Sequence, residues 1–123
     1  MQGLNGADLT INSPSQTWDG FVRGSGDVTL IGDITASVRP RFILDPGANF
    51  SLNTTTPSNA LEAPTVPLHV ATTGGVISIG GGVEATQVSL RTDTGVNLAG
   101  GTSVTGTART NAIVVEAGPS FNN

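Results

Sequence analysis

The residues of this sequence that could do chemistry are few, and their spacing fits no catalytic pattern. The only histidine, His69, lies in the strand-like run VPLHVAT, where its parity is opposite to that of Leu68 and Val70. This parity predicts a surface or interface position for His69. No G-x-S-x-G motif is present to mark a nucleophile. We therefore expect no catalytic residues and no enzymatic activity.

The acidic residues form no recognisable metal site or catalytic pair. Asp27 and Asp33 are six positions apart, so in a continuous strand they could not share a cation. The stretch DTGVNLAGG at 93–101 lacks the ligand spacing of a Ca²⁺ loop, although a loop-bound Ca²⁺ stays open as an alternative. A glycosidase needs two positioned carboxylates and usually aromatic platforms, whereas this chain has one Trp and no Tyr. We expect no metal and no cofactor.

The charge pattern argues against nucleic acid as a partner. The formal net charge is −4, and lysine is absent. The basic residues are Arg23, Arg39, Arg41, Arg91 and Arg109. Only Arg39 and Arg41 are close in sequence, whereas a groove that follows phosphates needs clustered positive charge. Cysteine is also absent, which excludes disulfides and cysteine-based zinc sites.

The N-terminal residues MQGLNGADLTINSPSQ contain neither a basic segment nor an apolar segment of a signal peptide. No apolar run approaches the roughly 20 residues of a membrane span. We expect a protein made in a host cytoplasm without a signal peptide and without a membrane partner.

Three consecutive glycines, Gly80, Gly81 and Gly82, lie between two strand-like runs. They lack the strand–loop–helix context in which glycines bind phosphate groups, and so does the stretch Gly24–Gly26. The triple glycine is either a slack loop or a corner where the chain reverses tightly or approaches another backbone closely. We treat it as a candidate glycine corner.

Strand signals dominate the rest of the chain. In DVTLIGDITASV the apolar residues alternate with polar ones, as in a strand with one buried side. Gly32 lies on the apolar side, and Ile31 is an exception on the polar side. These apolar residues are Val28, Leu30, Ile34, Ala36 and Val38. The segment RFILDPGANFSL reads as a hairpin in which Asp45-Pro46-Gly47 forms the turn, so that Phe42 and Leu44 face Phe50 and Leu52.

The segment 53–67 reads as a long polar connection, in which residues 59–63 could form one helical turn stopped by Pro64. Short strands are predicted after it, at 68–72, 76–79, 83–90, 94–98, 102–107 and 111–117. Their spacing is typical of a sandwich, a barrel or a compact β-solenoid. We predict an all-β fold, a single compact β-sandwich or barrel-like domain of short antiparallel strands at 21–123.

Residues 1–20 have weak periodicity and are predicted as an extended N-terminal arm that lies on a partner. The candidate partner contacts are Leu4, Leu9, Ile11, Trp18 and Phe21. The alternative for Trp18 is that it closes one end of the domain's own core.

Three features distinguish the chain. They are the short Gly/Thr/Ser-rich strands from GDVTLIGDITASV to NAIVVEAGPS, the N-terminus MQGLNGADLT and the absence of cysteine. In these features it resembles capsid decoration (cement) proteins and head-fibre or tail accessory proteins of tailed bacteriophages. That resemblance implies a trimer with an extended arm. A second resemblance, through GSGDVTLIGDITASV, is to filamentous-haemagglutinin or bactofilin-like β-helices, and it ends at Pro40 because no coil length repeats. A carbohydrate-binding β-sandwich is a third possibility.

These resemblances lead to two functional hypotheses. The first is a non-enzymatic virion structural protein on the capsid exterior, a homotrimeric decoration protein that bridges and stabilises subunits of the major capsid protein. The alternative is a glycan-binding β module of a tail or cell-surface protein, or a fragment of a β-solenoid adhesin.

Overall fold

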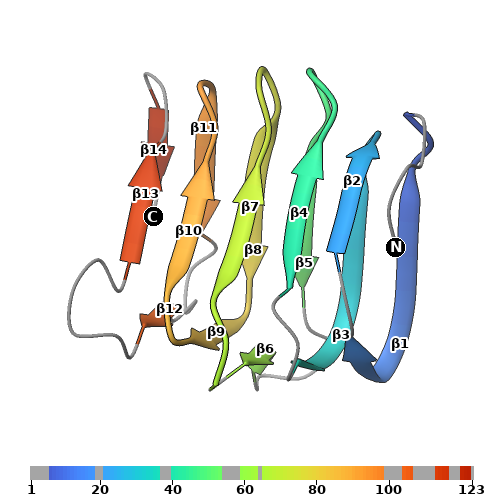
Figure 1. Cartoon of the computed structure of the whole chain (residues 1–123), viewed down its shortest axis with the longest axis vertical. Coiled ribbons are helices and arrows are strands. Elements are labelled where there is room, and N and C mark those ends of the chain that lie inside the picture. The colour runs from blue at the N-terminus through green and yellow to red at the C-terminus, as the bar shows by residue number, and fades with distance from the viewer. Residues whose placement is uncertain are drawn as a thin grey trace.

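The chain is a parallel β-solenoid of about 4 turns, in which successive coils lie side by side along one axis (Figure 1). The computed structural model describes residues 6–18, 21–36, 40–53, 59–63, 65–98, 104–106, 113–116 and 120–122. The strands are β1 (Leu9–Trp18), β2 (Phe21–Ser25), β3 (Val28–Ala36), β4 (Arg41–Leu44), β5 (Phe50–Asn53), β6 (Asn59–Ala63), β7 (Leu68–Ala71), β8 (Val76–Gly80), β9 (Gly82–Ala85), β10 (Val88–Arg91), β11 (Gly95–Leu98), β12 (Val104–Gly106), β13 (Ile113–Glu116) and β14 (Ser120–Asn122). None of the described residues belongs to a helix that is long and apolar enough to cross a membrane.

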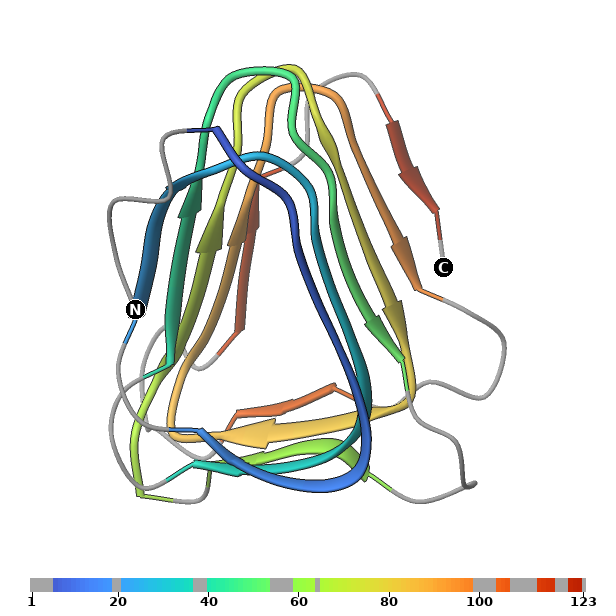
Figure 2. The same cartoon turned by 90° about the vertical axis from the view of Figure 1, so that its right-hand side faces the viewer.

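The coils have a triangular outline with three flat faces (Figure 2). Face 1 is formed by the first halves of β1 and β3 together with β5, β8, β11 and β14. Face 2 is formed by the second halves of β1 and β3 together with β6, β9 and β12. Face 3 is the separate sheet of β2, β4, β7, β10 and β13. Because β1 and β3 bend across a corner, faces 1 and 2 belong to one continuous sheet.

The all-β prediction is confirmed, but the antiparallel sandwich or barrel is wrong, because every described strand pair is parallel. The segment 41–52 shows the cause of the error. Asp45-Pro46-Gly47 turns the chain from face 3 to face 1, so β4 and β5 lie in different sheets and do not form a hairpin. Phe42 and Phe50 still meet, with ring centroids 5.0 Å apart, but they do so across the interior of the solenoid.

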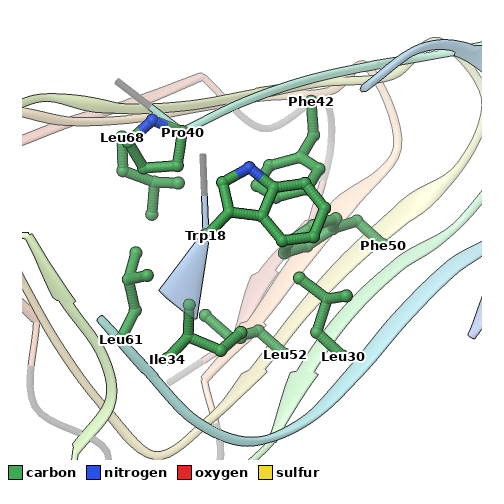
Figure 3. A pocket seen from close by; sticks show the side chains of 9 residues that line it. All are labelled: Trp18, Leu30, Ile34, Pro40, Phe42, Phe50, Leu52, Leu61 and Leu68. Atoms are coloured by element: carbon green, nitrogen blue, oxygen red, sulfur yellow. The ribbon is translucent and has the colours of Figure 1, made fainter. Parts of the chain in front are cut away.

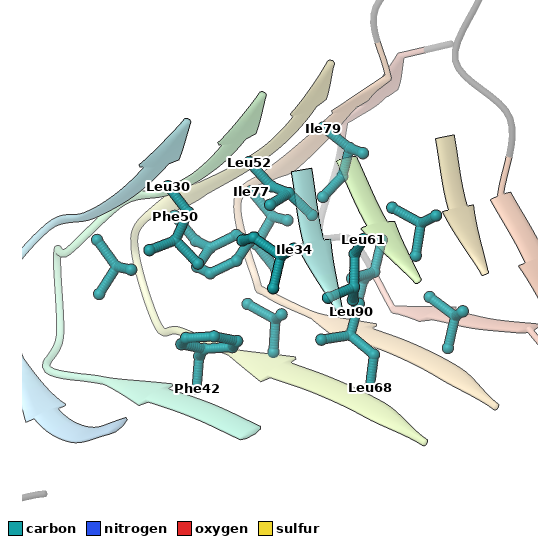
Figure 4. Packing of buried hydrophobic residues seen from close by; sticks show 14 of the residues in the cluster. Leu30, Ile34, Phe42, Phe50, Leu52, Leu61, Leu68, Ile77, Ile79 and Leu90 are labelled. Carbon is teal, nitrogen blue, oxygen red and sulfur yellow. The ribbon is translucent and has the colours of Figure 1, made fainter. Parts of the chain in front are cut away.

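The interior is a stack of apolar columns that the strand register creates (Figure 4). On face 1, Val28 is in register with Phe50, and Phe50 is in register with Ile77. All three side chains are buried. On face 3, Val70 is buried in the same way between Phe42 and Leu90. Each coil therefore covers the apolar side chains of the coil before it.

Polar side chains at the corner between faces 3 and 1 connect one coil to the next. The backbone N–H of Asp27 donates to Oδ1 of Asp8 at 2.8 Å, across 19 residues. The N–H of Asn49 donates to Oδ1 of Asp27 at 2.8 Å, across 22 residues. The N–H of Val76 donates to Oδ1 of Asn49 at 2.8 Å, across 27 residues. These side chains give partners to backbone N–H groups at the corner, and the unequal intervals show why no fixed repeat length is visible in the sequence.

The predicted arm does not stand apart from the domain. Its residues 9–18 form β1, which pairs in parallel with β3 and completes the first coil. Trp18 is only 8% exposed, and its ring lies 5.1 Å from that of Phe42 (Figure 3). A cavity of only about 10 Å³ remains beside Trp18, so the indole nearly fills this part of the interior. Trp18 is therefore a core residue of the first coil.

Two further segments differ from their predictions. Residues 59–63, predicted as a connection with a possible helical turn, form the strand β6. Ala, Leu and Glu are good helix formers, but tertiary contacts commonly override helix propensity, and here the segment pairs with β3 and β9. The predicted strand 83–90 is two strands, β9 and β10, because the chain turns from face 2 to face 3 at Thr86-Gln87.

Replacing Trp18 with alanine tests whether the first coil belongs to the core. Trp18→Ala should lower the free energy of unfolding by about 3–5 kcal/mol, because it opens a cavity beside Phe42. Phe21→Ala, in the same coil, is the matched control, because Phe21 is 38% exposed. Chemical denaturation monitored by circular dichroism gives both values, and equal losses for the two variants would contradict the structure.

Gly75 lies where two successive corners come closest together. A Cβ at this position would overlap the carbonyl oxygen of Ala48, which already accepts the Thr72 hydroxyl at 2.6 Å. The carbonyl of Gly75 in turn accepts the Thr92 hydroxyl at 2.6 Å. Both threonine side chains are buried, and their hydrogen bonds join this corner to its neighbours.

Gly75→Ala should therefore destabilise the protein more than Gly47→Ala does. Gly47 has a φ of +86°, but a Cβ there would meet no atom within 4 Å. Its replacement should cost only the left-handed backbone penalty of about 1–2 kcal/mol. Thermal melting of both variants at one protein concentration measures the difference, and a milder effect at Gly75 would show that the corner is loosely packed.

Candidate functional site

The structure separates the predicted partner contacts instead of grouping them on one surface. Leu4 lies outside the described residues. Leu9 and Ile11 are partly buried and pack against the core, and Trp18 is inside it. Phe21 is the one large hydrophobic side chain that is exposed among the described residues. Of the four candidates that the structure describes, Phe21 is therefore the one whose exposed position suits contact with a partner.

The triple glycine lies at the corner between faces 1 and 2. Gly80 ends β8, Gly82 begins β9, and Gly81 between them has a φ of 158°, close to extended backbone. Gly32, at the bend of β3, has a φ of 131°. The register places Ile31 beside Asn53 and Asn53 beside Gly80, so Gly32 and the triple glycine lie at the same corner. The chain changes face at these glycines and does not reverse, so the tight-reversal alternative does not apply.

The outer surface of face 3 gathers basic side chains that are far apart in the sequence. Its outward positions on β2, β4, β7 and β10 alternate with the buried residues Val22, Phe42, Val70 and Leu90. We call this surface the arginine face; its residues are Phe21, Arg23, Arg41, Ile43, His69, Ala71, Ser89 and Arg91. The arginine face carries every arginine whose side chain the structure describes, and also the only histidine of the chain.

Two adjacent strands at one end of the arginine face form a checkerboard of cationic and apolar side chains. Phe21 is in register with Arg41, and Arg23 is in register with Ile43. Neighbouring strands are about 4.8 Å apart, so the two arginines are diagonal neighbours at roughly 8 Å. Phe21, Arg23 and Arg41 are exposed, and the four side chains line an open hollow of about 240 Å³. No acidic residue occupies the outward positions of β2, β4, β7 or β10.

A second hollow, of about 350 Å³, continues from the first through Ile43. Its lining is richer in hydroxyl groups and contains one acid; the residues are Ile43, Leu44, Ala71, Thr72, Thr73, Arg91, Thr92 and Asp93. The exposed Thr73 offers a hydroxyl at its rim, whereas the Thr72 and Thr92 hydroxyls are bonded to backbone carbonyls. The two hollows share Ile43 in their linings, and the strands that line them, β2, β4, β7 and β10, follow one another along the solenoid axis.

Several of the acidic residues that the structure describes lie away from Arg23 and Arg41. Asp8, Asp27 and Asp93 follow the corner between faces 3 and 1, where their carboxylates accept backbone N–H groups. On face 2, the backbone register places Glu62 beside Glu84. At the far end of the arginine face, β13 brings Glu116 into register with Arg91. Among the arginines whose side chains the structure describes, Arg23 and Arg41 are neighbours at the N-terminal end of the face, and Arg91 lies farther along it.

The described residues include no cluster of three His, Cys, Asp or Glu side chains that could hold a metal ion. His69 is partly buried between Arg41 and Ser89 in the register of face 3. The neighbouring arginines Arg23 and Arg41 suit recognition of an anion. Guanidinium groups bind carboxylate, sulfate and phosphate oxygens in a planar, bidentate geometry.

The comparisons with known proteins find no match among family models, curated proteins or solved structures.

Sequence reasoning missed the arginine face because it looked for basic residues that are close along the chain. The available signal was a three-residue pattern with a buried apolar residue in the middle. Aligning FVR (21–23), RFI (41–43), HVA (69–71) and SLR (89–91) by that middle residue brings the basic side chains together.

The arginines of the checkerboard should contribute little to stability, because their side chains project into solvent. Arg23→Gln and Arg41→Gln should each change the free energy of unfolding by no more than about 0.5 kcal/mol. Urea denaturation curves provide the measurement. A loss above 2 kcal/mol would mean that these side chains hold the fold together and do not serve a partner.

Proposed function

We propose that the chain is a non-enzymatic β-solenoid module that binds a glycan through the arginine face. The supporting observation is the checkerboard of Phe21, Arg23, Arg41 and Ile43 around an open hollow. An exposed aromatic ring offers a flat apolar surface for the C–H face of a sugar. The guanidinium groups beside it can bond to the hydroxyl or acidic groups at the sugar's edge.

The shape of the solenoid supports the same function. Its coils repeat along one axis at a spacing of about 4.8 Å, which produces a flat and rigid face. A polymer that lies along such a face can contact several coils at once, so weak contacts with individual sugars add up. The hydroxyl-lined second hollow extends the surface in the direction that the polymer would follow.

The virion hypothesis stays a prediction, including its capsid location, its major capsid protein partner and its homotrimeric state. A decoration protein would use neutral surface to bridge coat subunits, and face 1 offers such a surface. Its outward column consists of Thr10, Thr29, Ser51, Ser78 and Asn97. Co-sedimentation with capsids, compared between wild type and variants of this column, tests that role separately.

Binding to a panel of immobilised neutral and acidic oligosaccharides tests the glycan proposal. We expect wild type to bind at least one class of glycan and Phe21→Ala to bind it at least tenfold more weakly, because the variant removes the exposed aromatic surface. Thr35→Ala, an exposed change on face 2, is the matched control and should bind like wild type. Failure of wild type to bind any glycan, or equal binding by Phe21→Ala, would contradict the proposal.

A further inference from the structure

We infer that the ligand of the arginine face is an acidic polysaccharide, whose carboxylate or sulfate groups are held between Arg23 and Arg41. This inference rests on the proposed glycan-binding function and specifies the chemistry of the glycan. The two arginines are diagonal neighbours on the adjacent strands β2 and β4. No acidic residue occupies the outward positions around them on these strands. Two like charges carried by neighbouring positions repel each other, and an anion placed between them offsets that repulsion.

The apolar partners of the arginines indicate that the anionic group belongs to a larger body. Arg41 is in register with the exposed Phe21, and Arg23 is in register with Ile43. A free inorganic anion would make no use of the apolar surface that these two side chains provide. A sugar acid has both parts, because its ring presents C–H groups to Phe21 while its acidic oxygens reach the guanidinium groups.

The surroundings favour a polysaccharide over a nucleic acid. A nucleic acid carries a phosphate at every nucleotide and is bound by several cations placed along its backbone. Here Arg23 and Arg41 lie at one end of the face, and the adjoining hollow contains Arg91 together with Asp93. The same hollow exposes the Thr73 hydroxyl and the methyl group of Ala71, which suit uncharged sugar units. The expected ligand is thus a chain in which acidic groups are separated by hydroxyl-rich rings.

Matched pairs of polymers test this inference with the full-length protein. One pair is polygalacturonate and the same polymer after reduction of its carboxyl groups, and the other is dextran sulfate and dextran. We expect wild type to bind at least one acidic member at least tenfold more tightly than its neutral partner in biolayer interferometry. The pair that shows the difference identifies carboxylate or sulfate as the recognised group.

Variants then locate the site. Arg41→Gln and Arg23→Gln should each weaken binding to the acidic polymer at least fivefold and bring its affinity closer to that of the neutral partner. Thr35→Ala on face 2 should bind like wild type. Circular dichroism of each variant shows whether the fold is kept, and Arg41→Lys separates the loss of planar geometry from the loss of charge.

Several results would overturn the inference. If neutral and acidic partners bind equally and the arginine variants bind like wild type, the chain binds glycans but does not recognise their acidic groups. If wild type binds only a neutral glycan of the panel, the inference also fails while the proposed function stands. If no glycan binds, both fail. Tighter binding to double-stranded DNA than to either acidic polymer would assign the face to nucleic acid instead.

Discussion

Parallel pairing of each coil with the next coil determines which residues of the described strands lie beside one another. The register aligns Val28 with Phe50 and then Ile77 inside the solenoid. The same kind of pairing also aligns the outward positions, so Phe21 lies beside Arg41 and Arg23 lies beside Ile43. The arginine face is therefore a consequence of the stacking that buries the core. A change of one residue in this register would exchange buried and exposed positions throughout the affected strand.

The corners keep the stack in register while the coil length varies. Asp8, Asp27 and Asn49 each accept a backbone N–H from the following coil, although the intervals between donor and acceptor are 19, 22 and 27 residues. Across these unequal intervals the strands stay aligned on the faces. This alignment leaves the faces regular enough to serve as a binding surface, while Asp8 and Asp27 lie at the corner and not among the outward residues of the arginine face.

Part of this structure could be predicted from the sequence, because local alternation reports which side of a strand is buried. Val28, Leu30, Ile34 and Ala36 are buried as their parity predicts, and the all-β class is confirmed. The strand partners could not be predicted in the same way. A turn such as Asp45-Pro46-Gly47 has the same composition whether it joins two antiparallel strands or carries the chain around a solenoid corner. Unequal coil lengths also concealed the repeat, and with it the alignment that brings Arg23 and Arg41 together.

Backbone nuclear Overhauser contacts in the isotope-labelled protein test the stacking most directly. The structure predicts parallel contacts from β4 to β7 and from β7 to β10, in which Phe42 lies beside Val70 and Val70 beside Leu90. It also predicts contacts from β2 to β4 that place Phe21 beside Arg41. Antiparallel contacts between residues 41–44 and 50–53 would instead show a hairpin. That result would contradict the solenoid and, with it, the existence of the arginine face.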